Sequence, residues 1–201
     1  MSRYLFPKTL FEMMDNFCPE NKAAWRAWLE ENHLKKEFIW LIFYKKSSPT
    51  PNLSWSEAVD EALCFGWIDS TKKAIDEEKY IQYFCKRKPK SNWSKVNKDK
   101  VKVLIEEGLM TEQGYKSIEI AKENGSWTIL DQVEALVVPE DLIAEWAHHK
   151  GAATYFDSLS NSKKKNLLYW IMSAKRTETR RKRIVAVAEH AGKNMLPKQF
   201  R

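Results

Sequence analysis

Hydrophobic and polar residues alternate along the first part of the chain in blocks of helical and then strand-like period. Apolar side chains recur three or four positions apart from Glu20 to Asn32, which predicts an amphipathic helix with paired tryptophans on its buried face. The next block, Phe38 to Lys46, opens with seven consecutive apolar residues rich in aromatic and β-branched types, which predicts a strand covered on both faces. Ser47 to Asn52 then has the composition of a turn.

A second helix is predicted to begin at a capping box. Ser54 and Glu57 have the spacing at which each side chain bonds the other residue's backbone N–H. Gly66 follows as a left-handed helix stop. The apolar stripe between them consists of Trp55, Ala58, Val59, Ala62 and Leu63. Two more strands, Ile68–Ile75 and Lys79–Cys85, are predicted to form a hairpin, so we expect a small, mostly antiparallel sheet of about three strands.

After Pro89 the periodicity is helical to the end of the chain. Caps and glycine stops delimit helices at Lys95–Glu107, Glu112–Asn124, Glu140–His149, Lys163–Lys175 and Glu178–Ala191, and Pro197–Arg201 is expected to be a frayed tail. The fold class is therefore α+β with an all-helical C-terminal half. At 201 residues we predict a single domain, 1–201, with an α+β core at 1–90 and a helical extension at 91–201 packed on it.

Composition agrees with a globular chain and excludes several classes of protein. A hydrophobic content of 43% and a charged content of 30% are ordinary globular values. The first residues lack the apolar core of an export signal, and the longest apolar run is far shorter than the ~20 residues that span a bilayer, so we expect a cytoplasmic location. Three cysteines without CxxC spacing predict reduced thiols.

Positive charge is concentrated in two stretches. Residues 86–102 hold eight basic residues against Asp99 alone, and residues 162–183 hold nine against Glu178 alone. Such clusters attract phosphates and nucleic acid. Tyr83, Phe84 and Trp93 interleave with the first stretch, which is compatible with single-stranded nucleic acid. The alternative is that the lysines only solvate helix faces.

Familiar catalytic and cofactor motifs are missing from the sequence. There is no glycine-rich phosphate loop, no GxSxG elbow and no HExxH pair. His148 and His149 are adjacent and point about 100° apart on a helix, so they do not form an i, i+4 metal pair. We expect no metal and no cofactor, and the catalytic residues stay unknown. Cys64 shares a helix side with carboxylates that suppress its thiolate, so a packed core thiol is favoured over a nucleophile.

A ligand pocket is the main candidate site. Gly66 is followed directly by Trp67 and then by Asp69, which places an aromatic ring and a carboxylate at a sheet edge. Residues 86–94 supply cations and hydroxyl groups just before a helix N-terminus, a combination that can bind an anion. The predicted pocket lies between sheet and helical half, with Trp67 and Trp93 as walls, Asp69 as orienting group, and donors Lys45, Arg87, Ser91, Ser94, Arg180 and Arg183. The alternatives are a core tryptophan with a turn-capping aspartate, a solvated loop, and an Arg–Asp clamp.

Short motifs follow one another along nearly the whole chain. They are Trp25-Arg26-Ala27-Trp28-Leu29 before a strand ending Lys45-Lys46, Ala62 to Asp69, Arg87 with Pro89, Ser91 to Lys95, Asn97, Asn124 to Trp127, Ala174-Lys175, Glu178 to Arg180, and Arg183-Ile184. Together these residues resemble the YdeI/OmpD-associated family. One departure is Cys85-Lys86-Arg87, where the family has a Pro-Arg pair.

The resemblance implies a bacterial protein linked to bacteriocin protection, tolerance of cationic antimicrobial peptides and association with an outer-membrane porin. It carries over no catalytic residues. Three hypotheses follow from the residues. The first is a stress-related protein that binds a small anionic or polar ligand, and the second is a nucleic-acid-binding protein that uses stretches 86–102 and 162–183. The third is an enzyme that acts at the same pocket with Asp69 as base.

Overall fold

The computed structural model of the chain describes residues 15–45, 47–49 and 52–201. Its contacts divide the chain into two compact units, residues 1–128 and 129–201. The sequence analysis placed the change from core to helical extension at residue 90, whereas the contacts place the division after Thr128 because two further helices belong to the first unit. The single domain that the sequence suggested stays a prediction.

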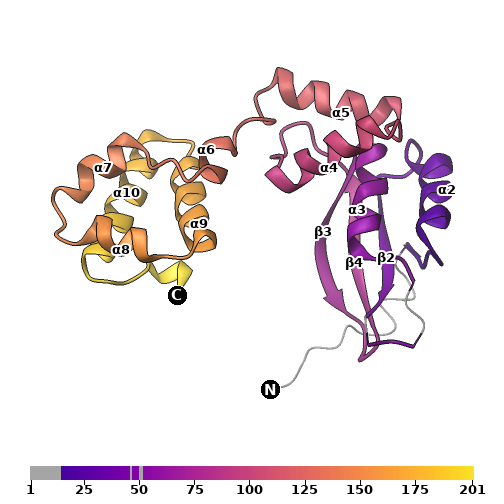
Figure 1. Cartoon of the computed structure of the whole chain (residues 1–201), viewed down its shortest axis with the longest axis horizontal. Coiled ribbons are helices and arrows are strands. Elements are labelled where there is room, and N and C mark those ends of the chain that lie inside the picture. Colours follow the sequence, from indigo (N-terminus) through magenta and orange to yellow (C-terminus); the bar gives the residue numbers. More distant parts are fainter. Residues whose placement is uncertain (1–14, 46, 50–51) are drawn as a thin grey trace. The chain divides into compact units, whose positions relative to one another are not determined.

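The N-terminal unit contains a mixed four-stranded sheet in the order β1-β2-β4-β3, with β2, β3 and β4 labelled in Figure 1. Its strands are β1 Asn16–Phe17, β2 Phe38–Tyr44, β3 Trp67–Ala74 and β4 Lys79–Lys86. β4 pairs antiparallel with β2 and β3, while β1 pairs parallel with β2.

The α+β class and the mostly antiparallel pairing are confirmed. The predicted count of about three strands is not exact, because the short parallel strand β1 adds a fourth. Two residues are too few to leave a period-two pattern. Lys46 and residues 50–51, which belong to the predicted strand end and turn, lie outside the described residues.

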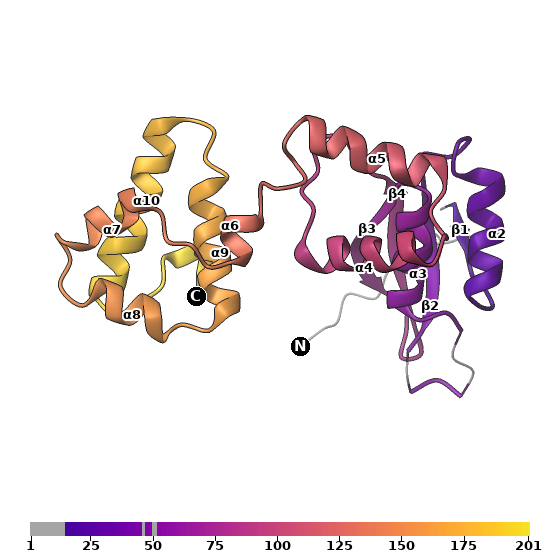
Figure 2. The ribbon, with the colours of Figure 1, turned by 45° about the horizontal axis from the view of Figure 1, so that its top comes forward.

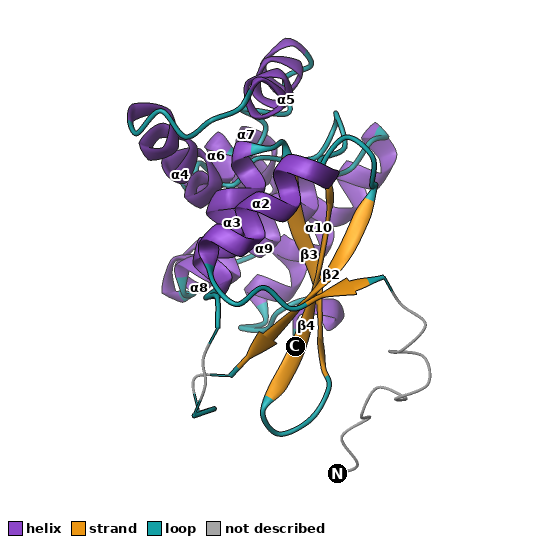
Figure 3. Cartoon of the chain, turned by 90° about the vertical axis from the view of Figure 1, so that its right-hand side faces the viewer, coloured by secondary structure: helices purple, strands orange, loops and turns teal. Residues whose placement is uncertain are grey.

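The described residues of this unit also form the helices α2 Lys22–Asn32, α3 Trp55–Cys64, α4 Lys95–Glu106 and α5 Glu112–Glu123. Each begins at a side chain that accepts a hydrogen bond from the first turn, and the cap of α3 is the predicted capping box. α2 and α3 lie on one face of the sheet (Figure 3), and α4 and α5 contact α3 (Figure 2).

The core of this unit forms where α2 and α3 meet alternate residues of the strands. Ile39, Leu41 and Phe43 of β2 are at most 1% exposed on this face, as the period of a strand requires. The indole N–H of the buried Trp25 donates to the Ala58 carbonyl at 3.0 Å, which ties α2 to α3. The predicted apolar stripe of α3 needs one correction, because Trp55 is 45% exposed.

α5 packs closely on the C-terminal end of α3. A Cβ at Gly114 of α5 would lie 2.3 Å from the Cys64 carbonyl oxygen, and the Thr111 hydroxyl donates to the same oxygen at 2.7 Å. Gly66 has φ +71°, and a Cβ there would lie 2.8 Å from the Gln113 carbonyl oxygen. These two glycines bring the start of β3 beside α5.

The C-terminal unit is built from helices alone within the described residues: α6 Asp131–Glu134, α7 Glu140–Trp146, α8 Ala152–Ser158, α9 Asn161–Met172, α10 Thr177–Gly192 and a 3-10 helix at Lys198–Phe200. α10 contacts α7, α8 and α9 and buries Ile184, Val187 and Ala188 against them (Figures 1 and 2).

The sequence analysis missed α6 and α8, which have four and seven residues and no side-chain cap. The predicted frayed tail is also corrected, because Phe200 contacts Trp170 with ring centroids 5.5 Å apart. Across residues 15–45, 47–49 and 52–201, no helix combines the length and apolar character needed to cross a membrane.

Candidate functional site

A pocket of about 160 Å³ lies where β3 begins and β4 ends. Its walls come from the residues after α2, the turn after α3, the chain that follows β4, and α5. The polar lining residues are His33, Lys86, Arg87, Lys88, Gln113, Lys116 and Ser117. Five of these are basic residue types, and none of the lining residues that the structure describes is acidic. We call this site the Arg87 pocket.

Arg87 is the central charged group of the pocket. Its guanidinium carbon lies 3.7 Å from the centroid of the Trp93 ring, and Nη1 donates to the Asn92 carbonyl at 3.0 Å. Nε and Nη2 are fully buried and have no hydrogen-bond acceptor within the described chain, and the same holds for Nε1 of Trp93.

Burial lowers the pKa of Arg87 to about 10, although the negative charge of Asp69 acts in the opposite direction. The group therefore stays cationic at neutral pH after losing most of its hydration. Buried polar groups normally have a partner, so the two Arg87 nitrogens without one indicate a place for an acceptor.

The loop that carries Arg87 is held from two sides. The Arg87 N–H donates to the Gly66 carbonyl at 2.9 Å, which joins the loop to the turn before β3. The side chains of Asn124 and Ser126 donate to the Pro89 carbonyl at 2.8 and 3.3 Å. Trp127 packs on Trp93 with ring centroids 4.9 Å apart. The loop conformation is thus determined by residues far apart in the sequence.

The structure brings together part of the predicted site. Trp67 is fully buried and lines the Arg87 pocket, with its indole N–H 3.3 Å from the His33 carbonyl. Ser91 lies beside Arg87, and its hydroxyl donates to the Lys88 carbonyl at 2.7 Å. The Ser94 hydroxyl accepts from the Asn97 N–H as the cap of α4. These two hydroxyls act in local structure.

Asp69 and Lys45 lie away from this pocket. Oδ2 of Asp69 accepts from Nε1 of Trp55 and from Nε2 of Gln82, both at 2.9 Å. Lys45 donates to the Asp76 carbonyl at 2.8 Å and lines a second pocket at the hairpin end of the sheet. Of the predicted residues, Trp67 and Arg87 thus line the Arg87 pocket and Lys45 lines the second pocket, whereas Asp69 lines neither.

Arg180 and Arg183 bind partners within the C-terminal unit. Arg180 of α10 forms a two-point ion pair with Asp141 of α7, with Nε···Oδ2 at 2.7 Å and Nη2···Oδ1 at 2.9 Å. This contact holds the pKa of the Asp141 carboxyl below its usual range. Arg183 donates to the Trp170 carbonyl and the Ser173 hydroxyl. That either arginine completes a site with Arg87 stays a prediction.

The sequence analysis did not find the pocket residues that α5 and the end of α2 supply, namely His33, Gln113, Lys116 and Ser117. Their charges and spacing are ordinary for exposed helices. One usable signal was Gly114, because a glycine inside a helical pattern often marks a close approach of two elements.

Cys64 is a packed thiol, as predicted. It is fully buried, and burial together with the charge of Glu61 raises its pKa to about 11, so its nucleophilic thiolate is suppressed. In the part of the chain that the structure describes, no three His, Cys, Asp or Glu side chains gather where they could hold a metal ion.

Comparison with known families assigns both units. Residues 17–117 match a domain of unknown function, DUF8412, and residues 135–194 match the family described as Bacteriocin-protection, YdeI or OmpD-Associated. No curated protein and no solved structure matches the chain. The resemblance to the second family is thus confirmed, although its model covers only the C-terminal unit. The chain therefore belongs to the DUF8412 family, whose model spans half of it, and its C-terminal unit matches the YdeI/OmpD-associated family over residues 135–194.

Proposed function

We propose that the N-terminal unit binds a small anion, a phosphate or carboxylate group, in the Arg87 pocket. The observation that carries the proposal is the desolvated, charged guanidinium of Arg87, whose Nε and Nη2 have no acceptor among the described residues. An oxyanion that reaches these N–H groups after a small side-chain movement would replace the hydration that Arg87 has lost. Exposed lysines at the pocket supply further attraction, namely Lys88 and Lys116.

The other two hypotheses have less support. In the second basic stretch, Lys165, Arg180 and Lys182 already form ion pairs with Glu134, Asp141 and Glu178, which lowers the charge available to nucleic acid. Asp69 accepts hydrogen bonds from the Trp55 and Gln82 side chains, which favours a structural role over a role as catalytic base. Nucleic-acid binding, catalysis, a cytoplasmic location and a role in peptide tolerance or porin association stay predictions.

The test is a titration with inorganic phosphate at constant ionic strength, followed by the indole ¹H–¹⁵N signal of Trp67. We expect a saturable shift. Arg87→Met should weaken binding by roughly tenfold or more, because a hydrogen bond to a charged group contributes about 1.5–3 kcal/mol. Lys116→Gln, on the exposed side of α5, should weaken it by roughly two- to fivefold.

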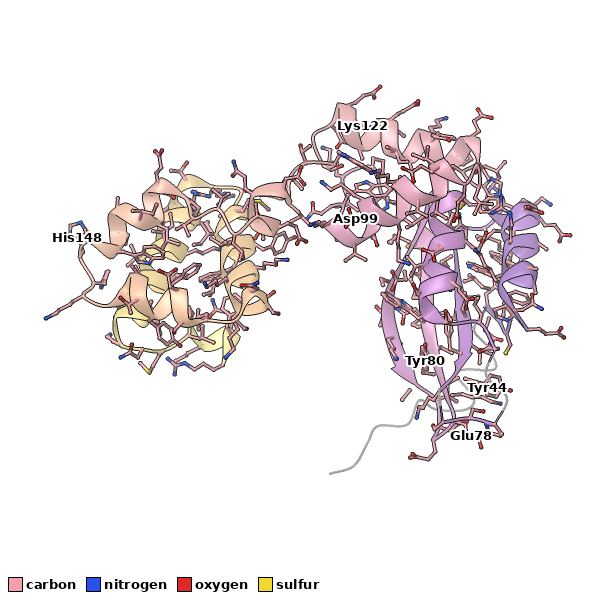
Figure 4. The ribbon with its side chains drawn as sticks, in the orientation of Figure 1. Tyr44, Glu78, Tyr80, Asp99, Lys122 and His148 are labelled. Carbon is pink, nitrogen blue, oxygen red and sulfur yellow. The ribbon has the colours of Figure 1, made fainter. Side chains whose placement is uncertain are left out.

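Lys122→Gln is the matched control. Lys122, labelled in Figure 4, lies on α5 and is absent from the lining of the pocket. It should leave the phosphate affinity unchanged. A thermal melt of Arg87→Met separates lost binding from lost folding. If Lys116→Gln and Lys122→Gln change the affinity equally, or if phosphate produces no saturable shift, the proposal is wrong.

A further inference from the structure

Trp55 is an exposed tryptophan in a chain that buries its other indoles. All nine tryptophans lie in the described part of the chain; Trp55 is 45% exposed, and the other eight are buried or half-buried. It occupies the first position of α3, directly after the Ser54 cap. A large apolar side chain left in water at a structured position is a frequent feature of binding surfaces.

Hydrogen bonds to the sheet fix the orientation of the Trp55 side chain. Its indole N–H donates to Oδ2 of Asp69 at 2.9 Å, and the same oxygen accepts from Nε2 of Gln82 at 2.9 Å. Gln82 is 4% exposed and also donates to the Ser70 carbonyl at 2.9 Å. The exposed ring is therefore connected to the buried centre of the sheet, so little side-chain entropy remains to be lost when a ligand stacks on it.

Trp55 borders a pocket of about 580 Å³, which is larger than the Arg87 pocket. Its aromatic lining also includes Tyr44 and Tyr80, which lie near the hairpin end of the sheet (Figure 4). We call this site the Trp55 pocket. It lies at the N-terminal end of α3, whereas the Arg87 pocket lies past its C-terminal end, about 15 Å away for a ten-residue helix.

The charge of the Trp55 pocket is positive. Lys45 and Lys72 line it, and none of its lining residues that the structure describes is acidic. The Lys72 ammonium lies 3.8 Å from the centroid of the Tyr80 ring, and the neighbouring Phe43 ring stacks on Tyr80 with centroids 5.1 Å apart. These contacts hold a cation at a pocket wall that also carries aromatic rings.

The carboxylates nearest in the sequence are bound elsewhere. Glu57 accepts from the Ser54 N–H at 3.0 Å, as part of the capping box. Asp76 accepts from the N–H groups of Glu78 and Lys79 at 2.8 and 2.7 Å in the hairpin turn. Asp69 lies behind Trp55, where its Oδ2 accepts from the Trp55 and Gln82 side chains. None of these three carboxylates lines the pocket, so none opposes an anionic group beside Lys72 from the wall.

We propose that the Trp55 pocket is a second ligand site, which binds a planar aromatic compound carrying a phosphate or carboxylate group. The ring stacks on the Trp55 indole, and the anionic group lies between Lys72 and Lys45. A single oxyanion fits the smaller Arg87 pocket with its basic side chains, whereas a compound with a ring requires the larger pocket, which has aromatic side chains in its lining. The two sites are independent, so either can exist without the other.

The test uses adenosine 5′-monophosphate as probe, with adenosine and inorganic phosphate as part-ligands. The readout is the ¹H–¹⁵N indole signal of Trp55, assigned by its loss in Trp55→Phe. We expect the monophosphate to shift this signal saturably, and each part-ligand to bind at least about fivefold more weakly. Trp55→Ala, followed by the backbone signals of Lys72 and Ala74, should weaken binding by roughly 5- to 150-fold, the range for one lost base stack.

Lys72→Gln should reduce the affinity for the monophosphate to that of adenosine. The matched control is Lys73→Gln, because the adjacent residue of β3 has the same charge but lies over the Trp40 ring on the other face of the sheet. It should leave the affinity unchanged.

Three outcomes would overturn the proposal: no saturable shift of Trp55 with a Kd below about 10 mM, equal losses in Lys72→Gln and Lys73→Gln, or shifts confined to Trp67. The Lys116→Gln variant separates the two sites, because it should weaken phosphate binding at the Arg87 pocket and leave the Trp55 signal unchanged.

Discussion

Gly114→Ala tests the contact that places α5 beside the sheet. In an open helix position this substitution stabilises a protein by about 1 kcal/mol, because alanine has the higher helix propensity. At Gly114 the new methyl carbon would lie 2.3 Å from the Cys64 carbonyl oxygen and 2.7 Å from the Met110 methyl group. Non-bonded heavy atoms prefer about 3.5–4 Å, so α5 must move by roughly 1 Å.

The cost of that movement outweighs the gain in propensity. Overpacking costs about 1–3 kcal/mol, and the upper end applies because the closest atom is a backbone carbonyl that does not rotate away. After subtraction of the propensity gain, the net destabilisation is about 2 kcal/mol. The Cys64 carbonyl oxygen also accepts hydrogen bonds from the Thr111 N–H and hydroxyl, at 3.1 and 2.7 Å. A movement of α5 away from this oxygen would weaken both bonds.

The assay is urea unfolding followed by tryptophan fluorescence. Seven of the nine tryptophans belong to the N-terminal unit, so the signal reports mainly on that unit. With a slope of about 1–3 kcal/mol per molar urea, the midpoint should fall by roughly 1 M. Glu119→Ala, exposed on the same helix, should shift it little. A Gly114→Ala protein as stable as the parent would refute the close packing of α5 on α3.

Two further predictions concern ionisable groups. Because Arg180 holds the pKa of Asp141 below its usual range, this ion pair stabilises the C-terminal unit above the unfolded pKa, and the contribution is lost as pH falls below about 4. Asp141 is 43% exposed and solvent screens the pair, so Arg180→Ala should cost about 1 kcal/mol at pH 7 and nothing at pH 2, measured by helical circular dichroism in urea. An equal loss at both pH values would contradict the ion pair. For Cys64, whose pKa is raised to about 11, alkylation by iodoacetamide at a pH of about 8 should be far slower than for the exposed Cys18. Mass spectrometry of the peptides measures the two rates, and similar rates would show that Cys64 is not buried.

Part of the candidate site was visible in the sequence because its signals are local. Arg87 and Trp67 were predicted from a helix stop and a basic turn, and both line the Arg87 pocket. The separation of Asp69 and Lys45 from Arg87 was not visible, because strand register and the position of each side chain along the sheet decide it. Trp55 was placed in a buried stripe because its spacing fits one, yet it lies at the first turn of α3, past the edge of the core.

The sequence by itself determined the α+β class, the three longer strands, the longer helices of both units and the resemblance of the C-terminal unit to the YdeI/OmpD-associated family. These features depend on short-range physics: side-chain period, capping residues and glycine stops act within a few positions of the chain. Only the tertiary structure decided which basic residues share a pocket, which arginines form ion pairs within the protein, and which tryptophan is exposed. Those properties depend on contacts between residues tens of positions apart, such as Gly114 with Cys64 and Trp55 with Asp69, which no local pattern specifies.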